Sequence, residues 1–228
     1  MPHLGVLTGV QAEARCLPPP KDGKPRITMA LSGARLAGAQ AAIAHLIDAG
    51  VSHLLSFGLA GGLDPALRPG RLLLPVCVAE PGGTIHPVDP AWHLTALAAL
   101  ADLSPVLAPL TGSDTVVTDP AAKAALRQRT AAAAVDMESH LLAEAAAQHG
   151  LPFLVLRAIC DPAGAALPPA ALVAVRADGT TDLRRLLAAL AARPSQLPDL
   201  LRLAGQARAA ERTLLRCCRR GIVRLVVG

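Results

Sequence analysis

Four carboxylates in this sequence stand where chemistry could be done. Glu13, Asp136, Glu138 and Asp161 each follow a short apolar run. A carboxylate is costly to bury, so its repeated placement at the ends of buried runs indicates a binding or catalytic site. Such groups serve as general acids, general bases or acceptors for hydroxyl groups. The structural alternative is that Asp136 or Ser139 caps a helix and that Asp161 begins a turn before Pro162.

Apolar strands alternate with helical segments of roughly ten to fifteen residues, a pattern that predicts an α/β fold. We expect three layers, α/β/α, around a central mixed, largely parallel sheet. The expected strands are His3–Thr8, Arg26–Leu31, Leu54–Phe57, Leu72–Val78, Val106–Leu110, Ala132–Val135 and Phe153–Ile159. The expected helices are Ser32–Asp48, Ala91–Leu100, Pro120–Arg129, Glu138–His149, Leu183–Ala192 and Leu197–Arg220. Residues 58–62 and 82–90, rich in glycine or proline, are expected to be loops.

In sheets of this kind, ligands bind beyond the carboxyl ends of the strands. Five candidates would therefore converge on one pocket: Glu13, the segment Gly58–Gly62, Ser113 with Asp114, Asp136 with Glu138, and Asp161. The alternative is that loops at one edge simply carry polar residues. No metal site is expected, because the spacing of the histidines and cysteines fits none.

The length of 228 residues suits one main domain. We expect residues 1–182 to form the catalytic domain and residues 183–228 to form a basic helical segment packed on it. No apolar run reaches the ~18 residues needed to span a bilayer, and the start of the sequence does not read as a signal peptide. These features favour a cytoplasmic protein with reduced cysteines.

The positive charge is concentrated at the C-terminal end. Residues 184–228 hold ten arginines and only two acidic residues, whereas residues 1–183 carry a small net negative charge. Arg208, Arg212 and Arg216 recur four apart, which predicts a basic stripe on a helix. One Trp, two Phe and no Tyr leave little for base stacking, so nucleic acid is disfavoured. The stripe indicates peripheral contact with anionic lipid at the inner membrane face, or else an ordinary solvated helix face.

Motifs in three parts of the chain resemble the purine nucleoside phosphorylase and nucleosidase superfamily. Gly5–Glu13 is similar to the N-terminal strand and Glu-bearing turn of the methylthioadenosine/S-adenosylhomocysteine nucleosidases. Gly58–Leu63 is similar to their Gly-Ser-Ala-Gly-Gly-Leu segment. Val135–Glu138 and Arg157–Asp161 resemble their Met-Glu and Ile-Ser-Asp motifs. The resemblance implies a nucleoside phosphorylase-like fold.

A narrower resemblance, to the hopanoid-associated phosphorylases, extends over nearly the whole chain. The segments that carry it are Ser56–Gly70, Val135–His140, Asp161–Pro162, Leu167–Leu172 and Arg193–Pro198. That family is understood to release adenine from adenosylhopane and to leave a ribosylhopane. The resemblance therefore implies cleavage of an N-glycosidic bond in hopanoid biosynthesis, and it favours a homodimer.

The resemblance implies a role for each candidate residue. Asp161 would be the general acid that protonates N7 of adenine, which requires a carboxyl group kept protonated near neutral pH by burial. Glu13 would orient or deprotonate the attacking water. Glu138 would hold the ribose hydroxyls, with the Met137 thioether against the sugar. The remaining expected substrate contacts are Ala60, Gly61, Val116, Val117, Asp136 and Cys160.

Departures from the family pattern leave the nucleophile open. The phosphate loop of the superfamily's phosphorylases is missing, and Ser56 stands where they carry an arginine. Arg15, Arg35 and Arg157 could substitute for these phosphate ligands, but Glu13 favours water. No cofactor is expected, and phosphate is the one candidate co-substrate. The alternatives are a methylthioadenosine/S-adenosylhomocysteine nucleosidase and a non-catalytic lipid-binding module on the same fold.

Overall fold

The computed structural model describes residues 2–18, 26–80, 82–173, 176 and 179–225. Nine strands form one central sheet in this part of the chain. They are β1 (His3–Thr8), β2 (Arg26–Leu31), β3 (His53–Gly62), β4 (Leu72–Leu73), β5 (Cys77–Ala79), β6 (Ile85–Pro87), β7 (Leu110–Gly112), β8 (Ala134–Asp136) and β9 (Phe153–Asp161). The order is β2-β1-β3-β8-β7-β5-β6, and β9 pairs with both β3 and β4. The β3–β8, β4–β9 and β5–β6 pairs are antiparallel and the other pairs are parallel, so the predicted mixed, largely parallel sheet is confirmed.

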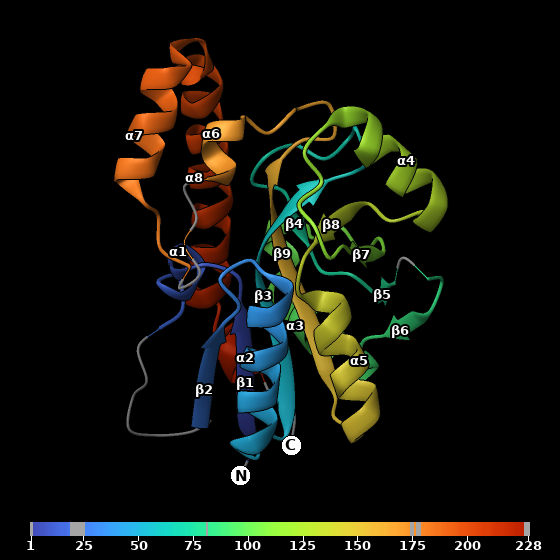
Figure 1. Ribbon diagram of the computed structural model, residues 1–228. Coiled ribbons are helices and arrows are strands. Elements are labelled where there is room, and N and C mark those ends of the chain that lie inside the picture. Colours follow the sequence, from blue (N-terminus) through green and yellow to red (C-terminus); the bar gives the residue numbers. More distant parts are fainter. Residues whose placement is uncertain (1, 19–25, 81, 174–175, 177–178, 226–228) are drawn as a thin grey trace.

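Helices cover both faces of this sheet and complete the predicted three layers. They are α1 (Gln11–Ala14), α2 (Leu36–Asp48), α3 (Pro90–Ala99), α4 (Pro120–Thr130), α5 (Ser139–His149), α6 (Pro169–Leu172), α7 (Leu183–Ala192) and α8 (Leu197–Arg219), with 3-10 turns at Ala101–Leu103, Pro194–Gln196 and Ile222–Arg224. Helices α2 and α5 lie in front of the sheet in Figure 1, and α8 lies behind it. No helix in the described ranges is long and apolar enough to cross a membrane.

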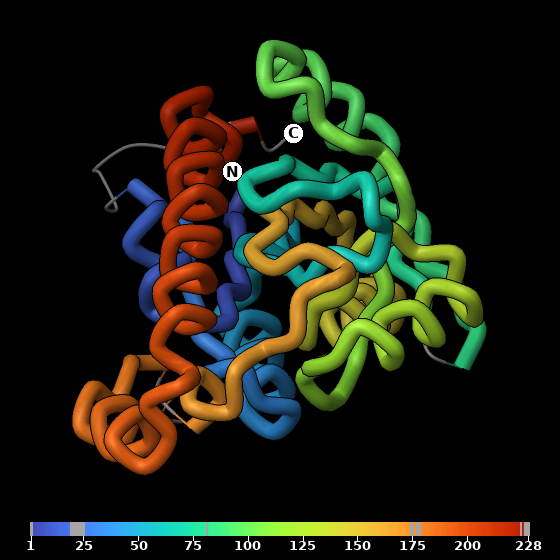
Figure 2. Tube along the Cα trace, turned by 90° about the horizontal axis from the view of Figure 1, so that it is seen from above, coloured from blue at the N-terminus to red at the C-terminus, as the bar shows by residue number. Residues whose placement is uncertain are grey.

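The C-terminal helix α8 has two different environments along its length. Ala210, Leu214 and Cys217, in its second half, are buried in the same apolar cluster as β3 and β9. Its first half lies beside α7 at one corner of the molecule, as Figures 1 and 2 both show. The segment after residue 182 thus shares a core with the rest of the chain, while the domain division at that residue stays a prediction.

Local sequence signals explain where helix α4 begins and ends. Asp119 accepts a hydrogen bond from the backbone N–H of Ala122, and Pro120 occupies the first helical position, as a capped helix start requires. Ala131 ends the helix in the left-handed conformation. The buried face of α4 carries Leu126 and, unusually, Lys123.

The structure corrects five expectations about local structure. Residues 58–62 form the end of β3 and are not a loop, because they pair with β8 and β9 across a bulge at Ala60/Gly61. Residues 72–78 form two strands, since Pro75 between them has no N–H to donate. In 82–90, Ile85–Pro87 forms strand β6 against β5. At 106–110, only Val106 makes a bridge and the strand starts at Leu110. The helix that the sequence predicts from Ser32 is α2, which begins only at Leu36 because Gly33 and Ala34 have positive φ.

Candidate active site

A cavity of about 720 Å³ lies where β1, β3 and β9 end. Its lining includes all ten residues that the sequence predicts for the site. Those residues are Glu13, Ala60, Gly61, Val116, Val117, Asp136, Met137, Glu138, Cys160 and Asp161. The structure therefore brings together side chains that are separated by up to about 150 positions in sequence, as strand-end placement predicts. Their individual roles stay predictions.

Glu13 is held rigidly by backbone donors. Its Oε2 accepts hydrogen bonds from Gly9 N at 2.6 Å and Val10 N at 3.0 Å, and its Oε1 accepts one from Leu59 N at 2.7 Å. Burial raises the pKa of Glu13, although Arg157 and the backbone donors act in the opposite direction. A carboxyl group with a raised pKa and a fixed orientation is suited to taking a proton from water.

Gly58 leaves the space that the carboxylate of Glu13 occupies. A Cβ at Gly58 would lie 2.4 Å from Arg157 Nη1 and 2.6 Å from Glu13 Oε1, closer than any normal contact. Both are buried, charged groups held by several partners, so neither moves aside cheaply. The strand position next to the site therefore has to be glycine.

Arg157 is the cationic centre beneath the cavity. Its Nε–H donates to Asp136 Oδ2 at 2.6 Å, one Nη2–H donates to Ser56 Oγ at 2.6 Å, and Glu138 Oε2 lies 3.6 Å from Nη2. Burial alone would lower the pKa of Arg157, but Asp136, Glu138 and Glu13 together raise it. Nε and Nη2 of this arginine are therefore engaged, and Nη1 is buried with no hydrogen-bond partner among the residues described, so the side chain offers no exposed group to phosphate.

The two carboxylates of the Val135–Glu138 segment have different surroundings. The Asp136 carboxylate accepts hydrogen bonds from Arg157 and from both the hydroxyl and the N–H of Ser139, which begins α5. Asp136 is thus not the N-cap of α5, which is Glu138, although its carboxylate accepts the first N–H of the helix. Glu138 has one side-chain hydrogen-bond donor, the hydroxyl of Ser32 at 2.8 Å. Burial, and then the neighbouring charges of Asp136 and Glu13, raise the pKa of Glu138 to about 7 against the opposing effect of Arg157.

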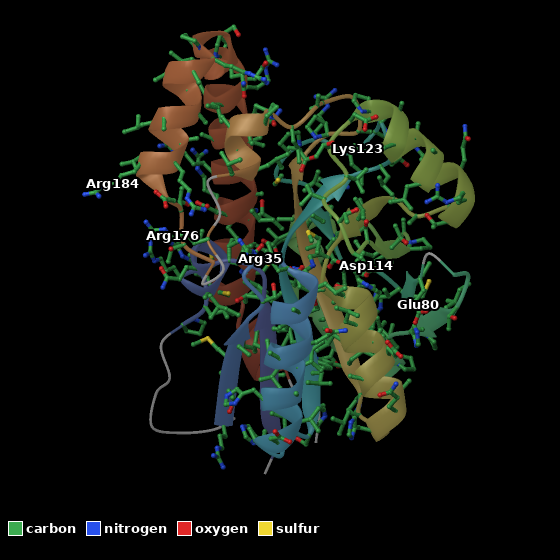
Figure 3. The ribbon with its side chains drawn as sticks, in the orientation of Figure 1. Arg35, Glu80, Asp114, Lys123, Arg176 and Arg184 are labelled. Atoms are coloured by element: carbon green, nitrogen blue, oxygen red, sulfur yellow. The ribbon has the colours of Figure 1, made fainter. Side chains whose placement is uncertain are left out.

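Asp161, the last residue of β9, lines the cavity and has only 4% of its surface exposed. The thiol of Cys160 donates to its Oδ1 at 3.0 Å, and burial followed by the Asp161 charge raises the pKa of that thiol well above its usual range. Lys123 Nζ contacts Asp161 Oδ2 and also donates to two backbone carbonyl groups. Lys123 enters from α4, as Figure 3 shows, and it is not among the residues that the sequence predicts for the site. The available signal was a lysine on the apolar face of a helix.

The other half of the cavity is almost entirely aliphatic. Helices α6, α7 and α8 contribute Leu172, Leu186, Leu187, Leu190, Leu200 and Leu203, among others. The apolar residues of α8 therefore divide into two groups: Leu200, Leu203 and Ala207 line the cavity, whereas Ala210, Leu214 and Cys217 pack in the core. The site consequently has one polar, carboxylate-bearing end and one hydrocarbon-lined end.

The remaining candidate residues lie elsewhere or in other contacts. Arg35 lines the cavity, whereas Arg15 is exposed and bonds to Gln11. Ser113 and Asp114, which the sequence places at this pocket, are not among the residues that line the cavity, whose lining includes the next residue, Thr115. Asp114 instead pairs with His140 near the start of α5 (Figure 3). No cluster of three or more His, Cys, Asp or Glu able to hold a metal ion occurs among the residues described.

Comparisons with known proteins agree with this architecture. The profile of the Phosphorylase superfamily matches residues 21–192. Futalosine hydrolase of Helicobacter pylori has a similar structure, with a TM-score of 0.71, 16% identity and 97% of each chain covered. The methylthioadenosine/S-adenosylhomocysteine nucleosidase of Neisseria meningitidis, in complex with methylthio-immucillin-A, gives 0.70 and 16%, with 98% of this chain and 99% of that chain covered. The Colwellia psychrerythraea nucleosidase, in complex with adenine, gives 0.70 and 20%, with 99% and 97% covered.

Identities this low establish the fold alone, and a comparison with curated proteins finds no match. The superfamily profile carries the assignment, because it covers about three-quarters of the sequence, including every carboxylate of the site except Glu13. This chain belongs to the phosphorylase superfamily.

Proposed function

We propose that this protein cleaves the N-glycosidic bond of an adenosine whose 5′ carbon carries a large apolar group, and that it releases adenine. The observation that carries the proposal is the division of the cavity. Its polar end holds Glu13, Glu138 and Asp161, and the same cavity continues between α6, α7 and α8 as a hydrocarbon-lined space. A nucleoside with an aliphatic 5′ substituent matches both ends.

At the polar end, breaking the bond from N9 to C1′ leaves a sugar cation and a purine anion. Asp161 gives a proton to N7 as the bonding electrons pass to the purine, which makes adenine a neutral leaving group. Glu138 accepts hydrogen bonds from the ribose hydroxyls. Glu13, fixed by three backbone N–H groups, takes the proton of the water that attacks C1′. Arg157 holds the carboxylates in place from below.

Water is the proposed nucleophile rather than phosphate. Arg157 is occupied by Asp136 and Ser56, and a phosphate placed beside Glu13 and Glu138 would meet two carboxylates. Arg35 is the lining residue that favours the alternative, a phosphorolytic reaction with phosphate as co-substrate. Glu13→Gln separates the two: a hydrolase should stall, whereas a phosphorylase should keep turning over when phosphate is supplied.

For the apolar end, we propose the hydrocarbon of adenosylhopane as the 5′ substituent, in hopanoid biosynthesis. The resemblance to the hopanoid-associated phosphorylases and the aliphatic lining of α7 and α8 both support this substrate. The alternative substrates, methylthioadenosine and S-adenosylhomocysteine, would leave the apolar end largely unfilled. A non-catalytic lipid-binding module would have no need of Glu13 or Asp161 at the polar end.

The experiment is adenine release by the purified protein, measured for adenosylhopane in detergent and for methylthioadenosine, each with and without phosphate. We expect a higher kcat/KM for adenosylhopane and no requirement for phosphate. Leu190→Gln, which places an amide in the apolar end, should lower kcat/KM for adenosylhopane and change that for methylthioadenosine far less. Equal kcat/KM for both substrates in the unmodified protein would refute the apolar 5′ group.

We further propose a homodimer in the cytoplasm that touches the inner membrane face. Two leucines at the cavity mouth are largely exposed, Leu187 at 55% and Leu201 at 65%. Arg184 on the same helix hairpin points away from the body of the molecule (Figure 3). Exposed leucines beside arginines suit an anionic lipid surface from which an apolar substrate could enter. Light scattering after gel filtration would test the dimer by its mass.

A further inference from the structure

Lys123 is a fully buried lysine with no place in the reaction described so far. Its ammonium group contacts Asp161 Oδ2 and donates to the carbonyl oxygens of Pro162 at 3.0 Å and Ala165 at 3.1 Å. It is absent from the lining of the large cavity, so it lies behind Asp161 as seen from the substrate. Burying an ammonium group is expensive unless partners compensate, so a lysine here calls for an explanation.

The choice of lysine is itself informative. The chain has 19 arginines and only three lysines, and the other two, Lys21 and Lys24, fall outside the described residues. Three oxygen atoms that converge on one point suit a compact ammonium group better than a planar guanidinium. The position is built to deliver one positive charge to one carboxylate oxygen.

This charge has a consequence for a general acid. Protonation of N7 leaves Asp161 as a carboxylate, and an ammonium group in contact with that carboxylate stabilises its charge. The other groups around Asp161 are the Cys160 thiol from β9 and, from α8, the Asp199–Arg202 pair. That pair lines a second cavity of about 190 Å³ that also reaches Asp161. Asp161 thus lies between the substrate cavity and a smaller polar cavity.

We propose that Lys123 is the positioning residue of the general acid: it fixes Oδ2 of Asp161 and stabilises the carboxylate that remains when the proton has passed to N7. The proton enters Asp161 from water, for which the smaller cavity offers a route. It leaves to N7 as the N9–C1′ bond breaks, and Lys123 keeps its own protons throughout. This inference rests on the proposed function, because it needs Asp161 to be the proton donor.

The test is the pH dependence of kcat/KM for adenine release from methylthioadenosine, for the unmodified protein, Lys123→Met and Lys123→Arg. Because the ammonium group stabilises the carboxylate that remains after proton transfer, its loss in Lys123→Met should move the alkaline limb of the profile upward. Lys123→Arg retains the charge, so the position of its alkaline limb should match that of the unmodified protein, while the poorer fit of the guanidinium should lower the rate at every pH. A lysine that merely braced residues 162–165 would lower activity equally at every pH. Coincident pH profiles for Lys123→Met and the unmodified protein would overturn the proposal.

A second measurement does not depend on how Lys123→Met folds. In the Lys21→Arg/Lys24→Arg variant, Lys123 is the single lysine, so ¹³C-lysine labelling reports on its charge alone. The proposal requires an ammonium group wherever the enzyme is active, and requires the lysine signal to change when Asp161→Asn removes the charge of its partner. A neutral amine at the pH of activity would overturn it. If no substrate releases adenine, the proposed function fails, while this signal still shows whether the ion pair exists.

Discussion

Arg157 and Asp136 form an ion pair in which neither side chain is exposed to more than 1%, with Nε 2.6 Å from Oδ2. The pair joins the end of β8 to the middle of β9, so it connects the segment that carries Glu138 to the strand that carries Asp161. Because Glu13 also lies close to the guanidinium, one arginine compensates three buried carboxylates. The geometry of the polar end depends on this residue.

Arg157→Met should therefore destabilise the fold strongly. It leaves buried carboxylates without a counter-charge, which typically costs about 3–5 kcal/mol in the free energy of unfolding. Arg127→Met is the matched control, since Arg127 pairs with Asp64 at 2.9 Å on a partly exposed surface, where such pairs contribute about 0–1 kcal/mol. Urea denaturation of both variants measures the difference. Equal denaturation midpoints for the two variants would show that Arg157 contributes no more to stability than Arg127 does.

Stability should also depend on pH through Glu138. Its pKa is raised from 4.5 to about 7 in the folded protein. The folded state therefore binds more protons than the unfolded state between these values. By linkage, the contribution of Glu138 to stability decreases as pH rises from about 4.5 to about 7. Glu138→Gln removes this dependence, so its melting temperature should fall less than that of the unmodified protein between pH 5 and pH 8. A parallel fall would contradict the prediction.

Gly58→Ala should displace the side chains of Glu13 and Arg157 from their positions in the site. The new Cβ would lie 2.4 Å from Arg157 Nη1 and 2.6 Å from Glu13 Oε1. Displacing a catalytic group by about 1 Å can cost ~10²-fold in rate, so a loss of this order in kcat is expected. Gly82→Ala is the control, because a Cβ there meets nothing within 4 Å. Assaying adenine release by both variants would decide, and unchanged kcat in Gly58→Ala would be evidence against a rigid Glu13.

The sequence predicts the carboxylates at the polar end of the cavity better than it predicts the residues and strand pairing that hold them in place. Glu13, Glu138 and Asp161 were identifiable because strand ends in such a sheet converge, whatever the details of pairing. Lys123 was not, because its partner lies 38 positions away and ion pairs between distant segments leave no local pattern. The pairing of residues 58–62 was missed for the same reason, since glycines read as a loop until neighbouring strands supply hydrogen bonds.

The basic stripe of α8 gives a prediction about lipid. Arg208, Arg212 and Arg216 are all exposed in the structure. Each basic residue near an anionic surface contributes ~1 kcal/mol, and salt screens it over a Debye length of ~8 Å. The protein should therefore sediment with anionic vesicles at low salt and less so at high salt. Changing all three arginines to Gln should weaken this binding. Equal binding to neutral and anionic vesicles would leave the stripe as a solvated helix face.

The most direct measurement of the central claim is adenine release by Asp161→Asn. The amide keeps the size of the side chain but cannot donate a carboxyl proton to N7. Because general acids typically contribute ~10²–10⁴-fold, we predict a fall in kcat of at least about a hundredfold, with the melting curve still cooperative. Asp114→Asn, at an exposed aspartate that pairs with His140, should retain activity. If Asp161→Asn retained more than about a tenth of the unmodified rate, Asp161 would not be the general acid, and the account of this site would be wrong.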